Sequence, residues 1–214
     1  MRLFKKIVFG GVLAIFSLSA QAVVIEQAPL DGGDGGLSVV DAGAQLAESF
    51  QFSSNVELND ISWWGSYTSG PQPTESFTVR VFADDSGEPA TTPLFETAYS
   101  GNGDSSDGLF DLFGGTVYRY DVSLVSPLSL FGGIDYYLSV INNDANDEWW
   151  WLQSNGGDNW ARVADADSWS YINNSLDLSY RLTAGAVAQV PEPGPMLLMS
   201  LPLFFLVARL MRKQ

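Results

Sequence analysis

Hydrophobic and polar residues alternate along the middle of the chain. The clearest stretches are ESFTVRVFA (75–83), YRYDVSL (118–124), DYYLSV (135–140) and LDLSYRLT (176–183). A period of two residues is typical of β-strands that bury one face, because successive side chains point to opposite sides of a sheet. No stretch in the middle of the sequence shows a sustained helical period. The pattern therefore predicts an all-β fold.

Segments rich in glycine, proline, asparagine and aspartate separate these stretches and are typical of turns. They are DGGDGG (31–36), SGPQP (69–73), DDSGEP (84–89), GNGDSSDG (101–108), FGG (131–133) and NNDAND (142–147). The spacing predicts about nine strands, which is typical of a β-sandwich or jelly roll. We expect this domain to cover residues 23–183, with the small and apolar residues 184–190 as a linker.

One strand is predicted to contain an irregularity. Its apolar residues stand at even positions up to Leu58 and at odd positions from Ile61 to Trp63. A regular strand cannot place both sets on one face, because its side chains alternate with a period of two. A β-bulge near Asn59 and Asp60 would bring both sets into the core.

The first 22 residues have the layout of a secretory signal peptide. A positively charged start is followed by an apolar run over residues 7–18 and by a small-residue cleavage site. The residues concerned are Arg2, Lys5 and Lys6, then Ala20 and Ala22. We expect residues 1–22 to direct export and to be removed, so that the mature chain begins near Val23. An uncleaved membrane anchor is the alternative.

The other end of the chain combines a proline motif, a short apolar run and a basic tip. The residues concerned are Pro191, Glu192 and Pro193, then 196–208, then Arg209, Arg212 and Lys213. As a helix the apolar run would measure about 20 Å, against about 30 Å of hydrocarbon in a bilayer. It therefore predicts a thin anchor whose basic tip stays in the cytoplasm and whose folded domain lies outside. The prolines before it favour an extended, protease-accessible approach to the membrane.

Together with the signal peptide, this combination resembles a PEP-CTERM sorting signal, over about residues 190–214. A weaker resemblance extends to the middle of the chain, which looks like a β-rich ectodomain found in substrates of this pathway. The stretches concerned are SWWGSY (62–67), ESFTVRVFADDSGEP (75–89), YRYDVSL, YYLSVINND (136–144) and the tryptophan run. The resemblance implies that an exosortase, an enzyme of the inner membrane, recognises the tail and removes it near Pro191–Pro193. It also implies a Gram-negative cell that makes exopolysaccharide.

The predicted mature domain is strongly acidic. Residues 23–190 hold four arginines, no lysine and 24 of the 25 acidic residues, which gives a net charge of −20. Such a charge repels nucleic acid and anionic lipid, so neither is expected as a partner of the domain. The chain has no cysteine, which excludes disulfides and thiol catalysis. It has no histidine, which removes the usual catalytic base and a common ligand of zinc and copper.

The sequence carries no familiar catalytic motif. A Ser-His-Asp triad is excluded by the missing histidine, and the DGGDGG run lacks the lysine and the following helix of a phosphate-binding loop. Carboxylate pairs can perform acid–base hydrolysis, but in so acidic a domain no spacing singles out one pair. We therefore expect neither enzymatic activity nor a cofactor.

Seven tryptophans are candidates for a binding surface: Trp63, Trp64, Trp149, Trp150, Trp151, Trp160 and Trp169. Neighbouring residues of a strand point to opposite faces, so Trp64 and Trp150 are candidates for ligand-facing rings. The same phase places Trp149 and Trp151 in the core. An outward ring can stack on a sugar, and Asn143 and Asp144 offer hydrogen-bonding groups nearby in sequence. The alternative is that loops cover the outer face and that the rings serve packing.

Two oxygen-rich loops are candidates for calcium, which prefers hard oxygen ligands. The acidic residues concerned are Asp84, Asp85, Asp144 and Asp147. Neither loop matches the EF-hand pattern. Aspartate, asparagine, serine and glycine are also ordinary turn formers. We expect turn chemistry at both loops, with calcium binding as the alternative.

These features predict an exported, non-enzymatic protein of the cell surface or extracellular matrix, associated with exopolysaccharide and biofilm. Its partners would be an exosortase and, before processing, the membrane. A carbohydrate-binding module at the same location is the alternative. If the tail is not removed, a third interpretation is a permanent inner-membrane protein that faces the periplasm.

Overall fold

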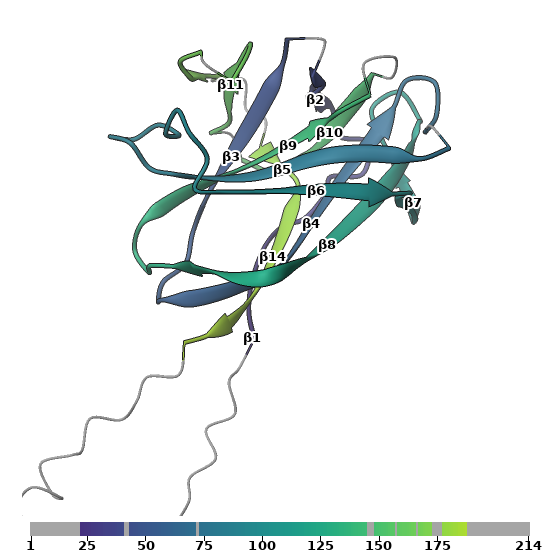
Figure 1. Cartoon of the computed structure of the whole chain (residues 1–214). Helices are drawn as coiled ribbons and strands as arrows, with labels where there is room; N and C mark the ends of the chain where they lie inside the picture. Colours follow the sequence, from purple (N-terminus) through teal and green to yellow (C-terminus); the bar gives the residue numbers. More distant parts are fainter. Residues whose placement is uncertain are drawn as a thin grey trace, which may run out of the picture. The chain divides into compact units, whose positions relative to one another are not determined.

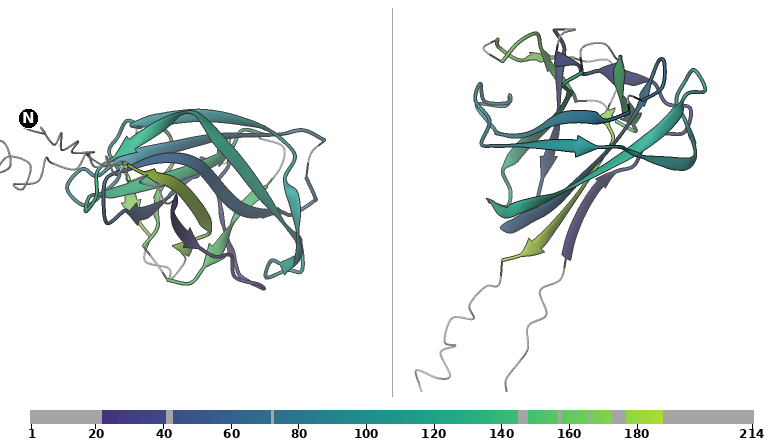
Figure 2. Two further views of the ribbon diagram at one scale, coloured as in Figure 1. Left: turned by 90° about the horizontal axis from the view of Figure 1, so that it is seen from below. Right: turned by 45° about the vertical axis from the view of Figure 1, so that its right-hand side comes forward.

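Two antiparallel β-sheets pack against each other and enclose a shared core, as in a β-sandwich (Figure 1; Figure 2). The computed structural model describes residues 22–40, 43–71, 73–144, 148–156, 158–165, 167–172 and 177–187. These residues all belong to one compact unit, Gln21–Val187. The predicted all-β class is confirmed.

The described residues contain fourteen strands. Their bounds are β1 (Ala22–Gln27), β2 (Gly35–Leu37), β3 (Gln45–Gln51), β4 (Val56–Tyr67), β5 (Glu75–Ala83), β6 (Phe95–Gly101), β7 (Asp104–Phe110), β8 (Thr116–Leu130), β9 (Asp135–Asn142), β10 (Trp149–Ser154), β11 (Trp160–Arg162), β12 (Ser170–Tyr171), β13 (Asp177–Leu178) and β14 (Tyr180–Ala186).

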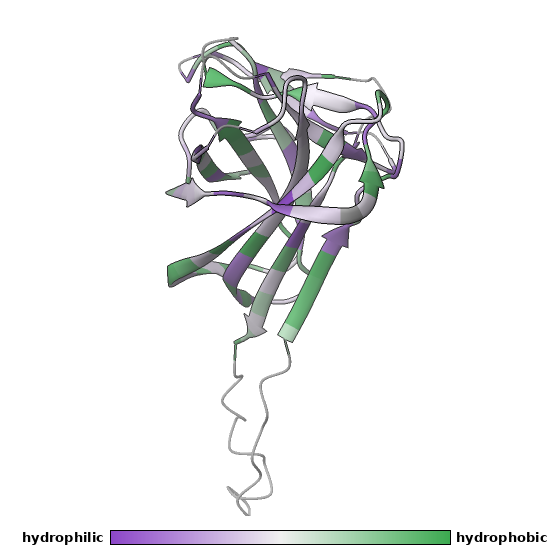
Figure 3. Cartoon of the chain, turned by 90° about the vertical axis from the view of Figure 1, so that its right-hand side faces the viewer, coloured by the Kyte–Doolittle hydropathy of each residue, from purple (hydrophilic) through white to green (hydrophobic). Residues whose placement is uncertain are grey.

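The larger sheet has eight strands and the smaller sheet has six. The strand order in the larger sheet is β1, β14, β4, β10 and β13. In addition, β2 pairs with β10, and β8 pairs with both β4 and β7. In the smaller sheet the order is β12, β11, β3, β9, β5 and β6. Hydrophobic and hydrophilic residues alternate along several strands (Figure 3), so that one face of each sheet supplies the core.

Aromatic rings dominate the core between the sheets. Trp63 in β4 stacks on Tyr120 in β8, with ring centroids 5.5 Å apart. Both rings contact Phe77 in β5. The ring of Trp149, at the start of β10, lies 5.0 Å from that of Phe77. Because β5 belongs to the smaller sheet and the other strands to the larger one, these rings join the two layers.

A glycine in β4 makes room for one of these rings. Gly65 pairs with Trp151 in β10, and its backbone approaches the indole of Trp149. A Cβ atom at Gly65 would lie 2.4 Å from atoms of that rigid indole. The glycine of SWWGSY is therefore required by close packing inside a strand and not by a turn.

The predicted irregularity in β4 is present. Asp60 pairs with Thr183 of β14, and Leu58 pairs with Ala184, so that Asn59 is an extra residue between two consecutive partners. The pairing of β4 with β8 shifts at the same place. This bulge brings Leu58 and Ile61 to the same face, and both side chains are fully buried.

Two segments that the sequence predicts as turns contain strands. Gly35–Leu37 forms β2 and pairs with β10. Asp104–Phe110 forms β7 and pairs with β8. Glycine and aspartate have low strand propensity, but backbone hydrogen bonds to a neighbouring strand override a weak local preference. These two strands are part of the reason why the prediction of about nine strands was too low.

The linker predicted over residues 184–190 begins too early. β14 continues to Ala186, with Gly185 opposite Ala22 of β1 and Ala186 opposite Val56 of β4. Ala184 is buried. These small residues remain in a strand because β14 lies between two strands that supply its backbone hydrogen bonds on both sides.

Both ends of the described domain lie at the same edge, because β1 and β14 are paired neighbours (Figure 1). Ala22, one of the two predicted cleavage-site residues, is the first residue of β1. The other residues of the predicted export and sorting signals lie outside the described residues: Ala20, the apolar run 196–208, Pro191, Glu192, Pro193, Arg209, Arg212 and Lys213. Within the described part of the chain, no helix has the length and hydropathy needed to cross a bilayer.

Candidate functional site

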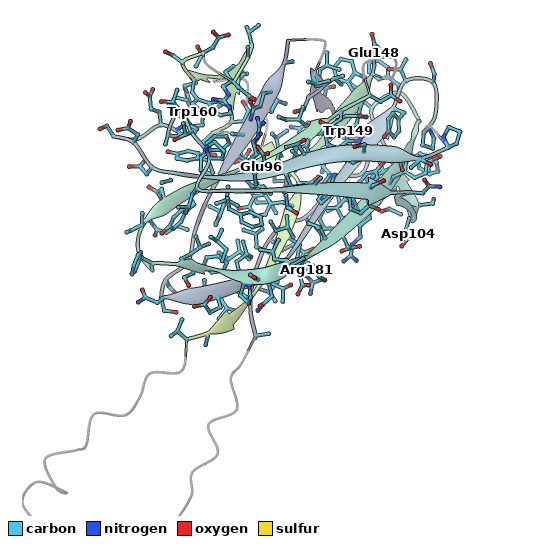
Figure 4. The ribbon with its side chains drawn as sticks, in the orientation of Figure 1. Glu96, Asp104, Glu148, Trp149, Trp160 and Arg181 are labelled. Atoms are coloured by element: carbon cyan, nitrogen blue, oxygen red, sulfur yellow. The ribbon has the colours of Figure 1, made fainter. Side chains whose placement is uncertain are left out.

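A cleft of about 430 Å³ opens at one end of the larger sheet. It lies where β4 ends and β10 begins, beside the turn between β7 and β8 and the segment before β2. Figure 4 shows Glu148, which lines the cleft, at the margin of the domain, with Trp149 further inside. Small-molecule sites have volumes of about 300–1,000 Å³, so the cleft can hold one or two small rings.

The indole of Trp150 forms part of the cleft wall. The strand phase that the sequence predicts is confirmed, since Trp149 and Trp151 are fully buried and Trp150 is half-buried on the opposite face. Trp150 Nε1 donates a hydrogen bond to Thr68 Oγ1 (3.0 Å), and Thr68 Oγ1 donates in turn to Glu148 Oε2 (3.2 Å). These bonds hold the indole in one orientation, which lowers the entropic cost of binding a ligand to it.

The turn between β7 and β8 forms another wall and is held by its own hydrogen bonds. Asp111 Oδ1 accepts hydrogen bonds from the backbone N–H groups of Phe113 (2.9 Å) and Gly115 (2.7 Å). The backbone N–H of Leu112 donates to the carbonyl of Gly33 (2.8 Å). The DGGDGG segment therefore anchors this turn through its backbone.

The cleft combines apolar and oxygen-bearing groups. Leu112 is 56% exposed and Phe113 is 88% exposed. Carboxylates of Asp34, Asp111 and Glu148 lie among the lining residues, and none of the described lining residues is cationic. Such a surface can contact the apolar faces of a ring and accept hydrogen bonds from its hydroxyl groups. It is unsuited to an anionic ligand.

Trp64, the second candidate for a ligand-facing ring, is buried, which corrects the prediction of an outward ring in contact with solvent. It is 6% exposed and packs with Val117 and Leu152 on the outer face of the larger sheet. Leu109 of β7 packs against the same group, and the Arg119 guanidinium lies 5.6 Å from the indole centroid. The outer face is covered at this point, so Trp64 serves packing.

Asn143 and Asp144 are not among the residues that line the Trp150 cleft. The side chain of Asn143 donates to Ser76 Oγ (3.2 Å) and accepts from Thr78 Oγ1 (3.0 Å), and both partners belong to β5. Asn143 is thus hydrogen-bonded to the smaller sheet. The structure separates it from Trp150, although the two residues are close in sequence.

Among the aspartates named for calcium, Asp84 shows the turn chemistry that was expected. Asp84 Oδ1 accepts hydrogen bonds from Gly87 N (3.0 Å) and from the hydroxyl of Tyr137 (3.2 Å). Asp85 is exposed, and Asp147 lies outside the described residues. Among the described residues, the acidic group with metal-ligand spacing includes none of the aspartates named for calcium.

That group consists of Glu48, Asp158 and Asp177, here called the acidic triad, and sequence reasoning missed it. One carboxylate oxygen from each residue lies within 4.8 Å of the others. Burial, together with the adjacent carboxyl of Asp158, raises the pKa of Glu48 to about 10. Burial also raises the pKa of Asp177. No local motif marks these residues, because they come from three separate parts of the chain.

No protein-family model matches the chain, and no curated protein is significantly similar to it in sequence.

Proposed function

We propose that the chain is an exported, non-enzymatic protein of the cell surface or extracellular matrix, which an exosortase sorts through the C-terminal tail. The layout of residues 1–22 supports export. The Pro191–Glu192–Pro193 triplet, followed by the apolar run and the basic tip, supports sorting. A domain without cysteine also folds outside the cytoplasm without disulfide exchange.

The position of the cleft agrees with this role. Ala186 at the end of β14 pairs with Val56 of β4, whereas Trp150 pairs with Ser66 of the same strand. These two positions on β4 are ten residues apart, which corresponds to about 33 Å along a strand. In Figure 1 the paired ends of β1 and β14 lie at the lower end of the domain, and β2 and β10 lie toward the upper end. Attachment through the chain ends would leave the cleft free to meet the surroundings.

The sorting role is tested by the mass of the protein recovered from the surface of its native cell. We expect the recovered protein to lack residues 1–22 and most of residues 191–214. Detection of the peptide MLLMSLPLFFLVAR (196–209) in surface-recovered protein would contradict the proposal.

Carbohydrate binding in the cleft is a second candidate function at the same location. The observation that carries it is the half-buried indole of Trp150, oriented by Thr68 and Glu148 beside the exposed ring of Phe113. Aromatic faces pack against the C–H faces of sugars, and carboxylate oxygens accept hydrogen bonds from sugar hydroxyls. A neutral polysaccharide is the expected ligand, because a domain with a net charge of −20 repels acidic sugars.

Affinity electrophoresis through gels that contain a neutral glucan, a neutral mannan or the host's own exopolysaccharide tests the cleft. We expect the wild-type protein to be retarded by at least one of them and Trp150→Ala to lose the retardation. Phe131→Ala is the matched control, because Phe131 is an exposed ring (63%) next to Leu130, which pairs with Val56 at the opposite end of β4. Equal migration of wild type and Trp150→Ala in every gel would refute binding by this cleft.

A further inference from the structure

The acidic triad lies where the two sheets meet. Glu48 belongs to β3 of the smaller sheet, Asp177 belongs to β13 of the larger sheet, and Asp158 lies between β10 and β11. One oxygen of each carboxylate lies within 4.8 Å of the others. A calcium ion with ligand oxygens at about 2.4 Å can span up to about 4.8 Å between two of them. The three oxygens therefore fit one coordination sphere.

The two oxygens of the fully buried Glu48 carboxyl differ in their partners. Oε2 accepts a hydrogen bond from the backbone N–H of Leu178 (2.8 Å). Oε1 is buried and has no hydrogen-bond donor. Buried acceptors in proteins nearly always have a partner, so an oxygen of this kind calls for a bound group. Oε1 is the oxygen that remains for coordination.

No basic side chain neutralises the triad among the described residues. Residues 23–190 contain neither lysine nor histidine. The four arginines form ion pairs elsewhere: Arg80 with Glu96 and Asp165, Arg119 with Asp121, Arg162 with Asp165, and Arg181 with Glu26. A buried group of carboxylates without a basic partner is electrostatically unfavourable, and a cation would supply the missing charge.

The backbone around the triad orients its carboxylates. The N–H of Asp158 donates to Asp177 Oδ1 (3.0 Å), and Ser49 Oγ donates to Asp158 Oδ2 (2.7 Å). Gly156 adopts a φ of 137°, and a Cβ atom at this position would lie 1.8 Å from Asp177 Oδ2. The loop thus closes tightly on Asp177. Hydrogen bonds that fix ligand carboxylates in this way are typical of the outer shell of metal sites.

We propose that the acidic triad binds one divalent cation of the size of calcium through Glu48, Asp158 and Asp177, with water completing the coordination shell. Carboxylate oxygens without nitrogen or sulfur ligands favour calcium over zinc or copper. Because two of its ligands come from different sheets, the ion would link the two sheets. The site is separate from the Trp150 cleft and does not depend on carbohydrate binding.

The test uses the full chain in mild detergent, stripped with EDTA and then titrated with calcium chloride by calorimetry. We expect one saturable binding event. At a free calcium concentration about 100-fold above the Kd, the melting temperature should rise by about 5–10 °C, because an ion that binds only the folded chain stabilises it.

Two variants and one control separate the triad from the general acidity of the surface. Glu48→Gln and Asp177→Asn should each weaken calcium binding by about tenfold or more, since each removes a charged ligand. Asp104→Asn removes an exposed carboxylate on β7 and should bind calcium as the wild type does. Glu48→Gln should melt in EDTA at or above the wild-type temperature, because the amide is neutral without the proton that Glu48 must keep when it is buried. Its binding result therefore reports on a folded protein even if Asp177→Asn fails to fold.

Wild-type calcium affinity in Glu48→Gln would overturn the proposal, as would the absence of a saturable event in the wild type. A wild-type melting temperature that calcium leaves unchanged, combined with a higher melting temperature of Glu48→Gln, would show that the carboxyls share a proton in place of a cation. That result would also overturn the proposal.

Discussion

Replacement of Trp151 by alanine tests the packing of the domain directly. The side chain is fully buried, and its Nε1 donates a hydrogen bond to the carbonyl of Ser179 (2.8 Å). Its ring centroid lies 6.4 Å from that of Trp149. Alanine removes the ring, leaves a cavity in the core and leaves the Ser179 carbonyl without its donor.

The cost of the cavity and the cost of the lost hydrogen bond can be added to give the approximate decrease in the free energy of unfolding. Truncation of a core tryptophan costs about 3–5 kcal/mol of unfolding free energy, and the lost hydrogen bond adds about 1 kcal/mol. In a domain of this size each kcal/mol lowers the melting temperature by about 2–4 °C. Trp151→Ala should therefore melt about 8–24 °C below the wild type. Trp150→Ala loses a partly exposed ring and one hydrogen bond to Thr68, so it should melt within about 4 °C of the wild type.

Thermal unfolding followed by far-ultraviolet circular dichroism measures both variants, and urea unfolding provides an independent free energy. Trp151→Phe keeps an aromatic ring but has no N–H group to donate to the Ser179 carbonyl. Its melting temperature should therefore lie between those of the wild type and Trp151→Ala. An equal decrease in melting temperature in Trp150→Ala and Trp151→Ala would refute the reasoning. The expected difference between the two variants depends on the opposite faces that their rings occupy in β10.

Three further predictions concern the tail, the acidic triad and the core. Glu192→Ala and Pro193→Ala should be exported but retained in the inner membrane on cell fractionation, and normal release of both would show that the triplet is not recognised. In EDTA, the free energy of unfolding should fall as the pH rises from about 4.5 to about 10, because burial holds the proton on Glu48 (pKa about 10) after the unfolded chain, with its ordinary pKa of 4.5, has released it. Urea unfolding at several pH values should show a smaller decrease of this free energy with pH in Glu48→Gln, and an unchanged decrease would contradict the assignment to Glu48. Gly65→Ala should cost about 1–3 kcal/mol in urea unfolding because its Cβ meets the Trp149 indole, and wild-type stability would show that the ring can move aside.

The alternation of hydrophobic and polar residues by itself determined the fold class and several local features. The stretch ESFTVRVFA is β5 with the expected bounds. The bulge at Asn59 and the outward position of Trp150 follow from the same rule, because the direction of a side chain depends on its position along its own strand. Information of this kind is local and can be read from a short window of sequence.

Pairing between distant segments was not visible in such a window. The glycine-rich β2 and the polar β7 are strands because β10 and β8 supply their hydrogen bonds. β14 extends through Ala184–Ala186 because β1 and β4 lie on either side of it. The local propensities of these residues favour turns or a linker, and the neighbouring strands outweigh them.

Tertiary structure alone decided which chemical groups meet. Trp64 and Trp150 lie on the same outer face, yet Trp64 packs under Leu109 of β7 while Trp150 borders a cleft. The three carboxylates of the acidic triad are far apart in sequence and close in space because β13 of the larger sheet meets β3 of the smaller sheet. The face on which a side chain lies is set within its own strand. Its burial and its neighbours depend on which strands and loops pack beside it, and that is a property of the whole folded domain.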